Sequence, residues 1–170
     1  MRRAHSTGNV FWCVSHGDKV SDVEVSGLNG EAEWPKAYSV LLADGPVSDL
    51  RMVEEGYDFS GLRFTHFSCC LLGRLETQGR THEMECMVAS LTVLGCRRLS
   101  SALWELCDLA SARFSFCLAK ALRKHSFVVK PHAHSFAIAY RQAICEFRTI
   151  DDGRWDHEYY WAPYILYGLP

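Results

Sequence analysis

The sequence lacks the features that mark several large protein classes. Its 170 residues contain no run of roughly 18 apolar residues, so no segment is expected to cross a membrane. Lysine and arginine number 18 against 20 aspartates and glutamates, and this formal net charge of −2 argues against a nucleic-acid-binding surface. The N-terminal segment is basic but has no apolar core of secretory-signal length. Repeats, low-complexity runs and interdomain linkers are also missing.

The composition is that of an ordinary globular domain. Hydrophobic residues make up 48% of the chain and charged residues 22%, which is typical of a folded, soluble protein. The length fits one domain with one substantial core, so residues 1–170 are taken as a single unit.

The cysteines are too few for a disulfide-rich secreted scaffold. Eight occur in 170 residues, a share below the one that marks such scaffolds. We therefore expect free thiols in a reducing compartment, the cytoplasm. Most should behave as small buried hydrophobes. This expectation covers the six that lie in apolar segments: Cys13, Cys86, Cys96, Cys107, Cys117 and Cys145.

Short apolar runs alternate with helical patterns along the chain. Strands are predicted over residues 9–15, 38–43, 62–69, 96–103 and 164–167. Helices are predicted over 49–55, 83–94, 108–124 and 133–148, with Gly95 ending the second of them, and loops over 18–36 and 73–81. Such alternation is typical of an α/β fold in which helices cover both faces of a mostly parallel sheet.

Two of the predicted strands end in residues that suit nucleophilic chemistry. The first runs into His16 and Gly17, and the third runs into Cys69 and Cys70. Ligands of parallel α/β sheets bind beyond the carboxyl ends of the strands, and a neighbouring imidazole can activate a thiol. From the residue types alone, a buried thiol and a structural histidine remain the simpler interpretation.

Other polar residues have plainer interpretations. Cys69 and Cys70 with His132 and His134 are the nearest approach to a zinc site, but neither pair has the usual ligand spacing, so neither metal nor cofactor is expected. His66 lies in mid-strand and is predicted to be a hydrogen-bonded core histidine.

Several strings, in order, resemble the CHAT domains of the caspase-like clan of cysteine peptidases. The segment that ends in His16-Gly17 resembles the family's histidine–glycine strand end. The segment Phe-Ser-Cys-Cys-Leu-Leu-Gly resembles its nucleophile turn, and Gly73, three residues after Cys70, selects Cys70 over Cys69. The match covers about residues 9–168, and its further strings are 39–44, 85–104, 119–123 and, most specific, 156–168.

The resemblance implies a caspase-like three-layer αβα sandwich that hydrolyses peptide bonds in protein or peptide substrates. Cys70 would attack the carbonyl, and His16 would activate the thiol or protonate the leaving amine. The backbone N–H groups of Gly17 and Cys70 would form the oxyanion hole. Residues near Trp104, Glu105 and Asp108 would wall the substrate cleft. Family members often carry TPR or other helical repeats elsewhere in a longer chain.

Departures from the family pattern favour an alternative. Leu71 and Leu72 stand where the family commonly has an acidic residue and threonine. Residues 105–108 read Glu-Leu-Cys-Asp, where the family usually has a proline and a pair of acidic residues. Only a short segment precedes the histidine strand, so we expect a partial domain that lacks the family's N-terminal strands and leaves a sheet edge exposed. The alternative is an inactive CHAT pseudoprotease or protein-interaction module.

Overall fold

A four-stranded sheet forms the centre of the fold. The computed structural model describes residues 10–15, 17–20, 37–42, 45–69, 76–77, 84–85, 87–126 and 133–168. The strand order is β1 (Val10–Val14), β5 (Phe64–Ser68), β8 (Arg98–Ala102) and β9 (Tyr164–Gly168). The first three strands are parallel and β9 runs antiparallel to β8. The prediction of an α/β fold with a mostly parallel sheet is confirmed.

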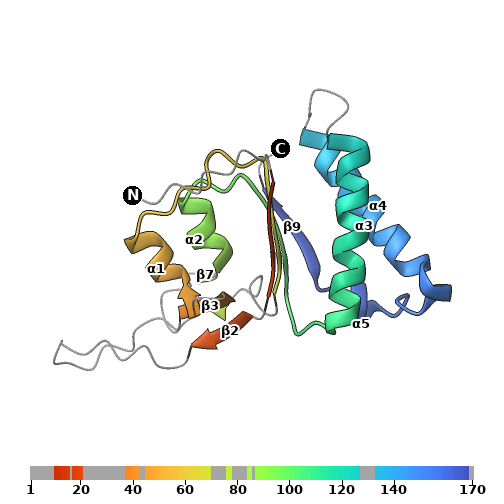
Figure 1. The fold of residues 1–170 in the computed structure, drawn as a ribbon, viewed down its shortest axis with the longest axis horizontal. Coiled ribbons are helices and arrows are strands. Elements are labelled where there is room, and N and C mark those ends of the chain that lie inside the picture. Colours follow the sequence, from red (N-terminus) through yellow and green to blue (C-terminus); the bar gives the residue numbers. More distant parts are fainter. Residues whose placement is uncertain are drawn as a thin grey trace.

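Helices cover both faces of this sheet. Figure 1 shows α1 (Asp49–Glu54) and α2 (Met87–Val93) on one side, and α3 (Asp108–Ser126) and α4 (Ala133–Thr149) on the other. Strand β5 is buried along its whole length. Its Phe67 belongs to the core under α1 and α2, whereas Phe64 belongs to the core under α3 and α4. Burial on both faces explains why the strand lacks a polar alternation.

Gly95 ends α2 as the sequence predicts. Its φ is +92°, and a Cβ at this position would lie 2.9 Å from Cβ of Ser60. A side chain would therefore be strained both by the backbone conformation and by the close approach of the 59–62 turn. Cys96, the next residue, donates its backbone N–H to the carbonyl of Leu91 at 2.9 Å, which closes the helix end.

A second sheet lies on the α1 and α2 side (Figure 1). It is an antiparallel meander of β2 (Gly17–Val20), β3 (Ala37–Leu42) and β4 (Gly45–Ser48). Val40 and Val47 join it to the core beneath α1 and α2. The prediction of a loop over 18–36 is wrong for Asp18, Lys19 and Val20, which pair with β3, and residues 21–36 lie outside the described residues.

A short hairpin corrects two further predictions. Strands β6 (Glu76–Thr77) and β7 (Met84–Glu85) pair antiparallel. The helix predicted from residue 83 therefore begins only at Met87, and the loop predicted over 73–81 contains a strand. Met84 fits the helical apolar spacing, but pairing with Thr77 determines its backbone conformation instead. The remaining residues of that predicted loop lie outside the described ranges.

The C-terminal part of the chain connects α4 to the last strand of the sheet. The polar turn predicted at 151–154 contains the 3₁₀ helix η1 (Asp151–Gly153), and α5 (Glu158–Trp161) then leads into β9. None of the described helices is long and apolar enough to cross a membrane.

Candidate functional site

The carboxyl ends of β1 and β5 lie side by side. Val14 is the register partner of Ser68, and the backbone N–H of Ser15 donates to the carbonyl of Ser68 at 3.4 Å. The sequence-predicted His16 and Cys70 follow Val14 and Ser68, each two residues further along the chain. Both lie outside the described residues. Gly17, the predicted oxyanion donor, is the first residue of β2 and is opposite Val40.

The first turn of α3 reaches this same edge. The hydroxyls of Ser68 and Ser111 hydrogen-bond to each other, and both side chains are buried. Asp108 begins α3 and is exposed. The N-terminal end of a helix carries a partial positive charge that favours anions nearby. The end of β5 therefore lies beside the first turn of α3, where the helix carries its partial positive charge and Asp108 adds an exposed carboxylate.

Trp104 and Glu105 are fixed against the segment that leads to β9. The half-buried indole of Trp104 donates its Nε1–H to the carbonyl of Tyr159 at 3.1 Å. The hydroxyl of Tyr159 donates to the carbonyl of Glu105 at 3.4 Å. These two bonds hold the chain that follows β8 to α5. The predicted wall residues thus lie beyond the carboxyl end of β8, the strand next to β5.

Two thiols meet beneath this edge. Cys13 of β1 and Cys69, the residue after β5, are both buried in the core under α1 and α2. A hydrogen bond with Cys69 lowers the pKa of the Cys13 thiol, against the opposing effect of burial. Cys13 is a buried core residue, as predicted, but its contact with Cys69 was not predicted. The contact depends on the register of strands that are distant in sequence, and the only signal in the sequence was a cysteine near the end of each strand.

The prediction that the other cysteines are buried is partly wrong. Cys96 and Cys117 are buried as expected, but Cys107 and Cys145 are exposed. Cys107 directly precedes α3, and Cys145 lies on α4 between the buried positions Ala143 and Phe147, on the side away from the core. Apolar neighbours in sequence do not reveal which side of a helix a residue occupies. Cys86 lies outside the described residues.

His66 is a core histidine, as predicted. It is fully buried in β5, and its ring hydrogen-bonds to Ser100 Oγ at 3.1 Å and to Ser115 Oγ at 3.2 Å. Burial lowers its pKa from 6.5 to about 3, because no water is present to solvate the charged ring. His66 is therefore neutral in the folded protein at neutral pH, and its role is structural.

This burial predicts an acid-sensitive fold. The unfolded chain binds a proton at His66 below pH 6.5 whereas the folded chain does so only near pH 3, so stability falls as pH decreases through this window. Between pH 7 and pH 5 the unfolding free energy should drop by about 2 kcal/mol from this group. Urea unfolding at a series of pH values measures the slope, with His66→Gln as the control that removes the titration. An equal slope in the variant would contradict the prediction.

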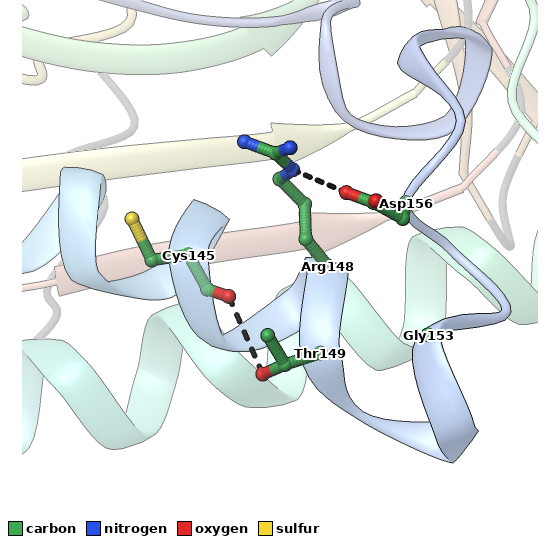
Figure 2. Close-up of a pocket in the computed structure, with 5 residues that line it drawn as sticks. All are labelled: Cys145, Arg148, Thr149, Gly153 and Asp156. Carbon is green, nitrogen blue, oxygen red and sulfur yellow. Dashed lines mark hydrogen bonds and ion pairs between the residues drawn. The ribbon is translucent and has the colours of Figure 1, made fainter.

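A surface pocket lies elsewhere, where α4 meets η1. Its volume is about 530 Å³, and its lining residues are Cys145, Arg148, Thr149, Gly153 and Asp156 (Figure 2). Arg148 and Asp156 form an ion pair at 2.7 Å, and the guanidinium also lies 4.8 Å from the ring centroid of Trp161. Since its two charged groups already pair with each other and no predicted site residue lines it, the pocket does not point to a catalytic role.

The zinc alternative receives no support from the part of the chain that the structure describes. Within those ranges no three or more histidine, cysteine, aspartate or glutamate side chains are grouped closely enough to hold a metal ion. Cys70 and His132, two of the four ligands considered, lie outside them.

The sequence matches no protein-family model, and a search of curated proteins finds no similar sequence. Function is therefore inferred from the residues and geometry of this chain.

Proposed function

We propose that the chain is a cysteine endopeptidase domain of the CHAT type, with a caspase-like αβα sandwich and a His16–Cys70 dyad. The observation that carries the proposal is the pairing of Val14 with Ser68 in the parallel β1–β5 ladder. The two dyad residues follow these partners at the same distance along the chain. A catalytic pair supplied by two neighbouring strand ends needs little loop structure to bring it together.

The proposed reaction is hydrolysis through an acyl-enzyme. The thiolate of Cys70 attacks the peptide carbonyl and forms a C–S bond, and the carbonyl oxygen becomes an oxyanion near the N–H groups of Gly17 and Cys70. The C–N bond then breaks as His16 gives a proton to the leaving amine. Water next attacks the thioester, which releases the carboxylic acid and restores the thiol. No metal or cofactor takes part in the proposal.

Two further features support this chemistry. Ser111 in the first turn of α3 bonds to Ser68, two residues before Cys70, and a helix N-terminus favours the thiolate form of a nearby cysteine. Trp104 and Glu105 are anchored through Tyr159 just beyond β8, which suits a fixed wall for an extended peptide. The described cysteines form no disulfide with one another, which fits the proposed cytoplasmic location.

Labelling by a peptide-linked electrophile tests the proposal. We expect a mixture of peptidyl vinyl sulfones to modify Cys70 at least tenfold faster than the exposed Cys107 and Cys145, as mapped by mass spectrometry. His16→Ala should remove this preference while labelling of Cys107 and Cys145 stays unchanged. These two exposed thiols serve as internal controls in the same molecule. A Cys70 that reacts no faster than they do would favour the inactive, interaction-module alternative.

A further inference from the structure

Cys13 and Cys69 come from neighbouring strands and share one core. Cys13 lies opposite Phe67 in the β1–β5 register, and Cys69 follows Phe67 by two residues. Cys13, Phe67 and Cys69 all belong to the core beneath α1 and α2. The two cysteines therefore occupy diagonal positions on the same face of the sheet.

Their thiols are in contact and unoxidised. Cys13 and Cys69 are hydrogen-bonded to each other, form no disulfide, and are 7% and 0% exposed. The hydrogen bond with Cys69 lowers the pKa of the Cys13 thiol, and burial opposes this effect. Cys69 lies just beyond the last residue of β5, so drawing the two sulfurs together does not require a β1–β5 pair to break.

Among the described residues, the other two buried thiols have different surroundings. Cys96 donates its S–H to Thr65 Oγ1 at 3.2 Å. Burial raises the pKa of Cys117 to about 11. A raised pKa keeps a thiol protonated and unreactive. Neither cysteine has the features that make the Cys13–Cys69 pair suited to oxidation.

We propose that Cys13 and Cys69 form a redox-active dithiol that hydrogen peroxide converts into an intrachain disulfide. The Cys13 thiolate attacks one peroxide oxygen, the O–O bond breaks, and a sulfenic acid and water result once a proton is taken up. The Cys69 sulfur then displaces the hydroxyl, which leaves as a second water after proton transfer. The two sulfurs lose two electrons in total, and the peroxide gains them. A dithiol such as dithiothreitol reverses the reaction.

Peptide mapping of peroxide-treated protein tests the proposal. The starting variant, C107S/C145S, removes the side reactions of the two thiols that are exposed among the described residues. After treatment we expect a cross-linked peptide joining Cys13 to Cys69, a mass lower by two hydrogen atoms, and full reversal by dithiothreitol. The disulfide closes a long loop of the unfolded chain, so the melting temperature should rise by about 10 °C on oxidation.

Matched variants separate this pair from other thiols. Cys96→Ala removes another buried cysteine of the same core and should leave the cross-link intact. Cys69→Ala should abolish both the cross-link and the rise in melting temperature. A disulfide that joins Cys13 to Cys70, a cross-linked dimer, or no cross-link at peroxide levels that oxidise Cys107 in the unmodified chain would overturn the proposal. Because the readouts are a mass and a melting temperature, the result is independent of the proposed peptidase activity.

Discussion

Under the proposed function, peptide hydrolysis is expected to fall by roughly 10³-fold or more when Cys70 is replaced with alanine. In the proposed mechanism the Cys70 thiolate forms the covalent bond to the substrate, and water alone would not replace it at a comparable rate. His16→Ala should cost about as much, because a nucleophile without its proton-transfer partner is inactive at neutral pH. Initial rates on a mixture of fluorogenic peptides measure both losses.

The double variant provides the sharper comparison. Residues that act as one catalytic unit are strongly non-additive, so Cys70→Ala/His16→Ala should be no slower than either single variant. Cys69→Ala is the matched control, since it removes the adjacent thiol and should retain most of the activity. Loss of activity in Cys69→Ala with full retention in Cys70→Ala would identify Cys69 as the nucleophile and show that its assignment to Cys70 is wrong. Circular dichroism of each variant separates lost chemistry from lost folding.

Replacing Phe114 with alanine should destabilise the fold by about 4 kcal/mol. Phe114 is fully buried in the core under α3 and α4 and stacks on Tyr164, with ring centroids 3.7 Å apart. It also meets Phe147 edge-on at 5.7 Å and Tyr140 at 5.8 Å. The substitution removes a large apolar side chain and leaves a cavity that the sheet on one side and α4 on the other cannot fill. Urea denaturation at pH 7 measures the difference.

Phe116 offers a control from the same helix. It is 65% exposed, so Phe116→Ala removes an equal number of atoms with little change in burial. Its effect should stay within about 0.5 kcal/mol. Similar losses for the two variants would mean that the α3–α4 core does not pack as described.

The elements were predictable where the pattern lies within one segment. The apolar runs around Cys13 and Phe67 are strands, and the spacing of Phe136, Ala139 and Ala143 marks the buried face of α4. Met84 shows the limit, because its helical spacing yields to a pairing with Thr77 that only the folded chain reveals. The antiparallel direction of β9 was likewise hidden, since a strand's own residues do not specify which way its neighbour runs.

The sequence predicted at which edge of the sheet the candidate site lies, but not how its residues are arranged there. The strands that lead to His16 and Cys70 indicated the location of the proposed site. The pairing of Val14 with Ser68 is a long-range register, and it was not predicted. Register depends on how both faces of β5 fill two separate cores, and composition does not contain that information. The contact between Cys13 and Cys69 was missed for the same reason.

The order of strands in the main sheet has a consequence for how the chain folds. Each neighbouring pair, β1 with β5, β5 with β8, and β8 with β9, joins segments that are far apart in sequence. In contrast, α3 and α4 are consecutive and pack on each other. Local contacts form early and distant ones late, so on a ribosome the helical pair can assemble before β8 acquires its partner β9. Until then the backbone edge of β8 that pairs with β9 has no partner strand, and an unpaired strand edge can pair with another chain and start aggregation.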